Sequence, residues 1–429
     1  MKKRAVVLVI DSLGIGSMND SDESAYANTF GHILDRAKFI SLKNLEALGI
    51  NHVLNHARLA TPPRPLASYG CARLMHIGAD SYMGHQELMG SKPKPPMTIP
   101  FFEAMDDVSV HLKRLNYAVE VIAGKCLLVN GLVVIADNIE ADFGQIYNVT
   151  APLDFISFED VLKIGREVRN VAKVSRVIPL GGCGVSACEI ISSIETSGGK
   201  GATGVNCSKS GVYKKGYRVR HLGYGVQSEE QAPSILVKNA IPTCLIGKMA
   251  DVIDCPGANF IEAIETDRVM CELIGKFEEM DYGFVAATVQ ETDLCGHTQD
   301  IERYAAKINT VDAYLGILLE RMMEDDLLII TADHGNDPTI GHNHHTREKV
   351  FLLAYIKNQA PRHLGERETL SDVGATVCRF FGVDKCENGV YLLHSSSRAL
   401  LGKPSKYRDI LSCDVCRTPI LLNNRPVSP

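Results

Sequence analysis

Three short apolar runs in this sequence each lead into an aspartate. The runs are residues 5–10, 282–289 and 327–330, and the aspartates are Asp11, Asp293 and Asp333. A continuous apolar run predicts a strand buried on both faces, which is typical of a parallel sheet covered by helices. Because the carboxyl ends of parallel strands lie along one edge of the sheet, where α/β folds place their ligands, we expect the three aspartates to gather at that edge.

The densest group of potential metal ligands follows the third of these runs. Residues 331–348 read TADHGNDPTIGHNHHTRE, and their polar side chains include Asp333, His334, Asp337, His342, His344, His345 and Arg347. Carboxylate oxygens and imidazole nitrogens bind hard and borderline divalent cations. A polar surface loop would explain a single histidine here, but the cluster directly after a strand favours a metal site.

Histidines accompany the aspartates closely enough to complete more than one such site. His297 follows Asp293 by four residues, and His334 adjoins Asp333. Carboxylates that gather at one point repel each other and raise each other's pKa, and bound cations remove that repulsion. Three aspartates and three histidines suffice for two divalent ions, an arrangement that clamps the attacking and leaving oxygens in phosphoryl transfer.

The composition excludes several other classes of protein. The chain has 429 residues, 45% of them hydrophobic, and a net charge of −6, with no basic stripe that would indicate a nucleic-acid partner. Its apolar runs are shorter than the ~20 residues that span a membrane, and Met1 to Arg4 lead into a strand, not a signal peptide. Thirteen scattered cysteines predict free thiols and a cytoplasmic location. Cys413 and Cys416 form a CxxC without nearby partners, which we interpret as incidental.

Prolines divide the chain into a core and an insertion. Three prolines between residues 95 and 100 mark a break near residue 102, after which short strands alternate with amphipathic helices. We predict a metal-binding catalytic core at 1–102 and 222–400, an inserted α+β cap domain at 103–221, and a C-terminal tail at 401–429. Within these segments we expect mobile loops at 198–204 and 209–220, and long helices at 259–279 and 301–323.

Ser81 lies where a loop, Gly78-Ala79-Asp80, enters a helical pattern. A serine at such a junction can simply cap the helix. It can also be a nucleophile held against a metal ion and a helix N-terminus. The residues alone leave both interpretations open.

Several motifs together resemble one family. They are VLVIDSLGIGS, ANTFGHI, ADSYMGHQELMG, APSILVKNAIPTCLIGKMADVI, DLCGHTQDIERYAAKI, TADHGNDPT, HHTRE and LGERETLSDVGATVCRFFG, which cover most of residues 5–382. In this order they resemble the phosphopentomutases of the alkaline phosphatase superfamily. The resemblance implies an α/β fold, with an alkaline-phosphatase-like core whose mostly parallel sheet is flanked by helices, interrupted by a cap.

The resemblance also implies an activity and a set of site residues. Such enzymes move phosphate between C1 and C5 of ribose or deoxyribose, through a phosphorylated enzyme and with a sugar bisphosphate as intermediate and activator. Ser81 takes the place of the family's phosphorylated threonine. Two manganese ions would be bound, one by Asp11, Asp333 and His334, the other by Asp293, His297 and His345. Lys248 resembles a lysine of the substrate-phosphate pocket, Asp142 a cap residue that contacts the sugar, and Arg220 an arginine for the substrate phosphate.

The sequence departs from the family at three points. Serine replaces threonine at position 81, Ala79 stands where the family has lysine, and no residue around 176–180 matches an additional family arginine for the substrate phosphate. A serine alkoxide can perform the same chemistry. The departures leave a related metal-dependent phosphatase, or a phosphomutase with a different phosphosugar or phosphate ester, as the alternative. A degenerate binding module is disfavoured because all six expected ligands are present.

Overall fold

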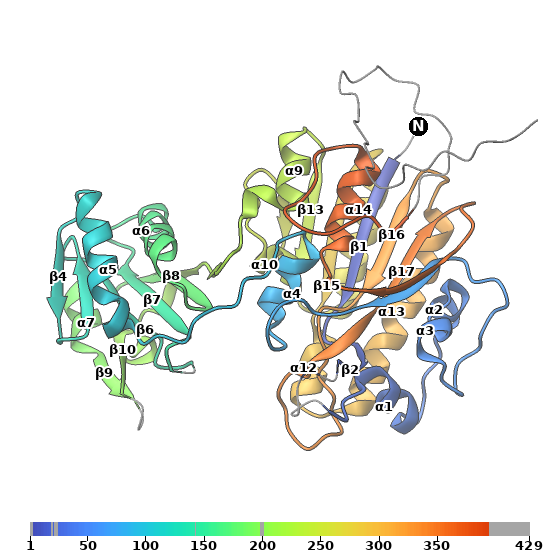
Figure 1. Cartoon of the computed structure of the whole chain (residues 1–429), viewed down its shortest axis with the longest axis horizontal. Coiled ribbons are helices and arrows are strands. Elements are labelled where there is room, and N and C mark those ends of the chain that lie inside the picture. The colour runs from blue at the N-terminus through green and yellow to red at the C-terminus, as the bar shows by residue number, and fades with distance from the viewer. Residues whose placement is uncertain (1–2, 19, 21–24, 142, 198–200, 394–429) are drawn as a thin grey trace, which may run out of the picture. The chain divides into compact units, whose positions relative to one another are not determined.

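The computed structural model describes residues 3–18, 20, 25–141, 143–197 and 201–393 (Figure 1). Asp142 and the tail at 401–429, with Cys413 and Cys416, lie outside the described residues. Residues Met1–Leu393 form one compact unit. Among the described helices, none is both long and apolar enough to cross a membrane.

The larger sheet has nine strands, and its central part is parallel. Its order is β14 (Asn259–Ile261), β13 (Thr243–Gly247), β15 (Tyr282–Val289), β1 (Lys3–Ile10), β16 (Leu327–Thr331), β17 (Glu348–Ile356), β3 (Ser68–Ala72) and β18 (His363–Arg367), with β2 (Gly14–Ser17) paired to β17. Every pair from β14 to β16 is parallel. The three apolar runs are therefore the adjacent strands β15, β1 and β16, and the predicted α/β class with a mostly parallel, helix-flanked sheet is confirmed.

One strand next to the candidate site runs the other way. β17 is antiparallel to both β16 and β3. No helix lies between β16 and β17, and a parallel return needs a crossover connection whereas an antiparallel neighbour does not. The histidine-rich segment 332–347 is therefore a connection that leaves and re-enters the same edge of the sheet.

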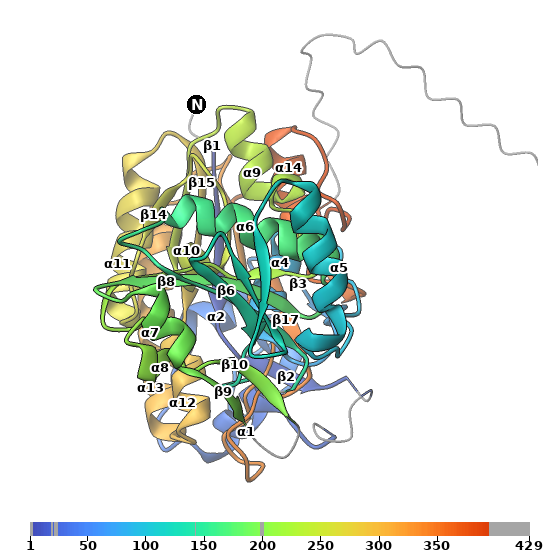
Figure 2. The ribbon, with the colours of Figure 1, turned by 90° about the vertical axis from the view of Figure 1, so that its left-hand side faces the viewer.

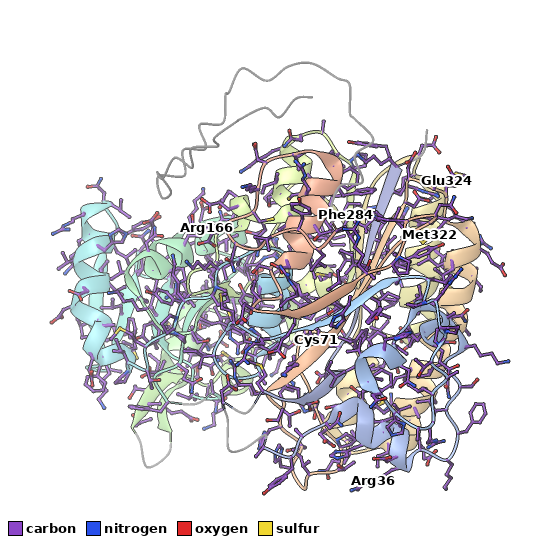
Figure 3. The ribbon with its side chains drawn as sticks, turned by 45° about the vertical axis from the view of Figure 1, so that its right-hand side comes forward. Arg36, Cys71, Arg166, Phe284, Met322 and Glu324 are labelled. Atoms are coloured by element: carbon purple, nitrogen blue, oxygen red, sulfur yellow. The ribbon has the colours of Figure 1, made fainter. Side chains whose placement is uncertain are left out.

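Helices from before residue 89 and after residue 231 cover the nine-stranded sheet. They are α1 (Thr29–Arg36), α2 (Lys43–Leu48), α3 (Asn51–Leu54), α4 (Ser81–Leu88), α9 (Ala232–Lys238), α10 (Lys248–Val252), α11 (Thr266–Glu279), α12 (Glu291–His297), α13 (Ile301–Arg321) and α14 (Asp372–Phe381), with a 3-10 turn at Ser228–Glu230. Between α13 and β16 the side chain of Met322 is buried and that of Glu324 is exposed (Figure 3).

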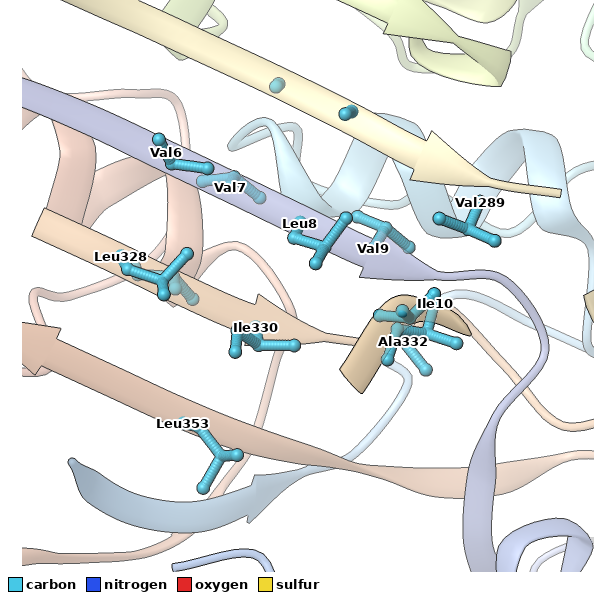
Figure 4. Packing of buried hydrophobic residues seen from close by; sticks show 14 of the residues in the cluster. Val6, Val7, Leu8, Val9, Ile10, Val289, Leu328, Ile330, Ala332 and Leu353 are labelled. Carbon is cyan, nitrogen blue, oxygen red and sulfur yellow. The ribbon is translucent and has the colours of Figure 1, made fainter. Parts of the chain in front are cut away.

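The core lies around β1, as its unbroken apolar sequence requires. All side chains from Arg4 to Ile10 are buried, and Figure 4 shows those of β1 packed beside Leu328 and Ile330 of β16. Phe284 of β15 belongs to the same cluster (Figure 3). Truncating such a fully buried aliphatic side chain to alanine typically costs about 2–5 kcal/mol. The three strands that carry the aspartates are thus held rigidly side by side.

A second sheet is built entirely from strands between Val119 and Gly223. Its order is β11 (Lys215–Val219), β8 (Arg176–Cys183), β7 (Ile146–Pro152), β6 (Val133–Asp137), β5 (Cys126–Val129) and β4 (Val119–Ile122), with β12 (Leu222–Gly223) paired to β8. Helices α5 (Phe101–Arg114) and α6 (Phe158–Val171) share a hydrophobic cluster with it (Figure 2). The remaining elements are α7 (Ala187–Ser192), β9 (Ile194–Ser197), β10 (Ala202–Val205) and α8 (Cys207–Ser210). That this segment is an inserted cap stays a prediction.

Three local expectations were wrong. Residues 198–204 are not simply a loop, because their described part, 201–204, includes the start of β10, which pairs with β9. Residues 259–279 do not form one helix, because Asn259–Ile261 pairs with β13 as a strand and α11 begins only at Thr266. The carboxylate of Glu291 accepts hydrogen bonds from the backbone and hydroxyl of Thr266, which fixes that start from far along the chain. Residues 209–220 are not simply a loop, because β11 pairs with the edge of β8.

Candidate metal centre

The three aspartates gather at the carboxyl edge of the parallel strands. Asp11 follows β1 directly, Asp333 follows β16 by two residues, and Asp293 lies on α12 just after β15. Since β15, β1 and β16 are neighbours in register, their ends bring residues from 11 to 333 to one place. This is the arrangement that the apolar runs predicted.

Asp11, Asp333 and His334 form one group with the geometry of a metal site. One ligand atom from each lies within 4.8 Å of the others, and all three residues are fully buried. His334 Nε2 lies 3.5 Å from Asp11 Oδ1 and 3.3 Å from Asp333 Oδ2. His334 Nδ1 donates to the carbonyl of Gly335, which leaves the Nε2 lone pair for a ligand.

Two of these buried atoms have no hydrogen-bond partner within the described part of the chain. They are Asp11 Oδ1 and His334 Nε2, which face each other. A buried polar atom without a partner costs free energy that a bound group can recover. A carboxylate oxygen and an imidazole lone pair both accept, so the group that fits between them is a cation.

Asp293, His345 and His297 form the second group. His345 Nε2 lies 3.2 Å from Asp293 Oδ1, and His297 Nε2 lies 3.4 Å from Asp293 Oδ2. The two histidine Nε2 atoms are 3.1 Å apart, and each ring directs Nδ1 to a backbone carbonyl, Asn343 for His297 and Ala79 for His345. Two lone pairs aimed at one carboxylate again fit a cation.

His334 joins the two groups. Its ring stacks on that of His345 with centroids 4.1 Å apart, and Asp293, His334 and His345 by themselves satisfy the spacing of a metal site. The resemblance assigned His334 to the first ion alone. In the described structure the six residues that it implied as ligands form one continuous cluster. Their assignment to particular ions stays a prediction.

Electrostatics at this edge are dominated by buried negative charge. Burial and the neighbouring carboxylate of Asp333 raise the pKa of Asp11 to about 7. Burial lowers the pKa of His334 to about 4, so its imidazole is neutral and able to bind a metal at neutral pH. A carboxylate whose ionised form is destabilised and a neutral imidazole are together a donor set that favours a divalent cation.

Lys248 lies among these carboxylates. Its Nζ is 2.8 Å from Asp11 Oδ2 and 3.6 Å from Asp293 Oδ2. As the first residue of α10, it follows β13 at the same edge of the sheet. The resemblance implied a substrate-phosphate contact for Lys248, and this position is adjacent to where such a phosphate would meet the two ligand groups.

Ser81 is placed against the first group and is not the helix cap. Asp80 is the N-cap of α4, since its side chain accepts from the backbone N–H of Met83 at 2.9 Å. The interpretation of Ser81 as a cap is therefore wrong. The Ser81 hydroxyl donates instead to Asp333 Oδ2 at 2.7 Å, and its side chain is buried.

Two residues near Ser81 had been assigned no role from the sequence. Arg176 donates through Nη2 to Asp80 Oδ2 at 2.9 Å, so an arginine from the segment 176–180 does reach this loop from β8. His85 lies one helical turn after Ser81, and that spacing on α4 was the only available signal. Among the described residues no hydrogen bond joins Arg220 to Ser81, and the buried Nε of Arg220 has no hydrogen-bond partner there.

Gly84 allows α4 to lie directly on the end of β16. A Cβ atom at Gly84 would stand 2.9 Å from the carbonyl oxygen of Asp333 and 3.0 Å from its Cβ. We expect Gly84→Ala to push α4 away from Asp333 and to weaken both divalent-metal affinity, measured by calorimetry, and turnover. Unchanged metal affinity would contradict this.

A matched control exists on α11. A Cβ at Gly275 meets nothing within 4 Å, so Gly275→Ala is expected to stabilise its helix by about 0.5–1 kcal/mol and leave metal affinity unchanged.

Known proteins are similar to this chain along most of its length. Residues 3–385 match the metalloenzyme superfamily. The chain is 28% identical to a phosphopentomutase of Kosmotoga olearia and 29% identical to one of Clostridium perfringens, in each case over 90% of this chain and 97% of the relative. A solved phosphoglycerate mutase of Leishmania mexicana is 13% identical, with a TM-score of 0.44, over 92% of this chain and 98% of that one. From the superfamily match over nearly its whole length, the chain belongs to the metalloenzyme superfamily.

Proposed function

We propose that this protein is a phosphomutase that interconverts ribose or deoxyribose 1-phosphate and 5-phosphate through a phosphoserine at Ser81. The observation that carries the proposal is the 2.7 Å hydrogen bond from Ser81 Oγ to Asp333, a member of the candidate ligand group that shares His334 with the second group. The pentose substrate is supported by similarity to relatives named phosphopentomutase, which the match covers over 97% of their length.

Each part of the site has a role in this proposal. Asp11, Asp333 and His334 would hold one divalent ion, and Asp293, His297 and His345 the other, with manganese as the proposed metal. Bound there, the ions supply stabilisation of the charge on the attacking and leaving oxygens. The Ser81 hydroxyl donates its proton in a hydrogen bond to Asp333 Oδ2, which leaves the lone pairs of Ser81 Oγ available for attack. Lys248 brings a positive charge to the place where a phosphate would approach Ser81.

Asp142 and Arg220 are the other two residues that we propose as substrate contacts. Asp142 lies outside the described residues, and Arg220 keeps its proposed phosphate contact on the strength of its buried, partnerless Nε. All eleven described cysteines are free, which supports a cytoplasmic location.

A phosphosugar panel tests the proposal and separates it from the phosphatase alternative. Manganese-loaded protein is incubated with ribose 1-phosphate, ribose 5-phosphate, their deoxy forms and other phosphosugars, with a sugar bisphosphate as activator. A mutase returns phosphate to the sugar, so we expect isomer formation without release of inorganic phosphate. Release of phosphate without isomer would identify a phosphatase. Turnover of other phosphosugars but of neither pentose phosphate would overturn the pentose assignment.

A further inference from the structure

The geometry points to His85 as a positioning residue that fixes Asp333 and Ser81 relative to each other. This inference rests on the proposed function, because it assigns His85 to the same reaction. His85 lies on α4 one turn beyond Ser81, and its side chain is fully inaccessible to solvent. It belongs to neither candidate ligand group.

The two ring nitrogens of His85 have different partners. Nδ1 lies 2.8 Å from the carbonyl oxygen of Ser81 and 3.1 Å from Asp333 Oδ2. Nε2 lies 2.9 Å from the hydroxyl of Thr288, on β15. Both Nδ1 partners only accept, so Nδ1 carries a proton, and the Thr288 hydroxyl can donate to Nε2. The Nδ1 proton therefore faces both the Ser81 carbonyl oxygen and Asp333 Oδ2.

The consequence of these contacts lies at Asp333. Its Oδ2 accepts a hydrogen bond from the Ser81 hydroxyl at 2.7 Å and lies 3.1 Å from His85 Nδ1, while its Oδ1 accepts from the backbone N–H of Ser12 at 3.0 Å. Groups that follow β1 and groups on α4 thus contact both oxygens of the carboxylate. Because one imidazole also contacts the Ser81 carbonyl, it ties the nucleophile's backbone to the carboxylate that its hydroxyl faces.

A purely structural role would give a different result on substitution. A buried histidine that only fills space is replaced by leucine with a loss of stability and nothing more. A positioning histidine passes its effect to Asp333, and outer partners of metal ligands typically change metal affinity or activity by about 10–100-fold. Substitution by asparagine distinguishes the structural role from the positioning role, because it keeps a donor at the place of histidine Nδ1. The side-chain nitrogen of asparagine is the same number of bonds from Cα as histidine Nδ1.

The experiment compares His85→Asn, His85→Leu and Thr288→Val in the full-length protein. Manganese affinity is measured by titration calorimetry on metal-stripped protein, phosphorylation of Ser81 by intact mass after addition of a sugar bisphosphate, and stability by thermal unfolding. We expect His85→Leu to lose about 10–100-fold in manganese affinity and to be phosphorylated more slowly. His85→Asn should recover most of both, and Thr288→Val, which leaves Nδ1 and its contacts in place, should lose less than His85→Leu.

Two results would overturn the inference. One is wild-type manganese affinity in a folded His85→Leu protein. The other is an equal loss in His85→Asn and His85→Leu, since the amide donor should then have helped. If His85→Leu does not fold, His85→Asn and Thr288→Val still decide: a loss of affinity in His85→Asn as large as that of a ligand substitution would contradict the inference. Failure of the proposed function is distinguishable, because it would show as wild-type protein that binds manganese but turns over no pentose phosphate.

Discussion

Ser81→Ala is expected to abolish formation of the phosphoenzyme and to lower turnover by at least about 10³-fold, because removal of a nucleophile leaves only the residual effect of binding and electrostatics. Manganese affinity should change little. Asp333 keeps its contacts with the backbone of Ser12 and with His85 in this variant, so the ligand carboxylate stays in place.

Intact mass spectrometry after incubation with a sugar bisphosphate measures this directly. The wild-type protein should gain one phosphoryl group and Ser81→Ala none. Ser81→Thr serves as the matched control, since it keeps the hydroxyl and adds only a methyl group, and it should stay active if that methyl group fits. A phosphorylated Ser81→Ala protein would rule out Ser81 as the acceptor.

The part of the site that the sequence predicted best depends on burial. A strand without alternation, such as residues 5–10, has to be covered on both faces, and only a parallel sheet between helices offers that environment repeatedly. Once the runs before Asp11, Asp293 and Asp333 are assigned to such a sheet, the common edge for their carboxyl ends follows from chain direction alone. The structure places these strands next to one another.

What the sequence could not show depends on contacts between distant residues. The start of α11 is set by Glu291, 25 positions away, and the ring of His85 is held by Thr288, 203 positions away. Neither pairing leaves a local pattern. The choice of Asp80 over Ser81 as helix cap is likewise a matter of backbone geometry, since both residue types are good caps.

Asp11→Asn is expected to have the second large effect, a loss of manganese binding at the group formed with Asp333 and His334. The substitution keeps the shape of the side chain but removes its charge and one of its two acceptor oxygens. Substitution of a residue that only hydrogen-bonds to a metal ligand already lowers metal affinity by about 10–100-fold, so loss of the charge of a ligand should lower it at least that much. Calorimetry and elemental analysis after dialysis measure the affinity and the stoichiometry. Full retention of both metals would remove Asp11 from the ligand set.

In the metal-free protein the same substitution should not lower the stability of the folded state, although it lowers manganese affinity. Burial, with Asp333 nearby, raises the pKa of Asp11 to about 7 from its ordinary value of 3.8. A raised carboxyl pKa means that the folded state holds this proton more tightly than the unfolded state, so stability falls as pH rises from 3.8 to about 7 and stays reduced above it. Asparagine cannot ionise, so the variant does not lose this stability.

Thermal unfolding of metal-free protein at pH 8 should therefore show Asp11→Asn at least as stable as wild type. Added manganese should raise the unfolding temperature of wild type far more than that of the variant. A metal-free variant less stable than wild type at pH 8 would mean that the ion pair between Asp11 and Lys248 outweighs the cost of burying the carboxylate.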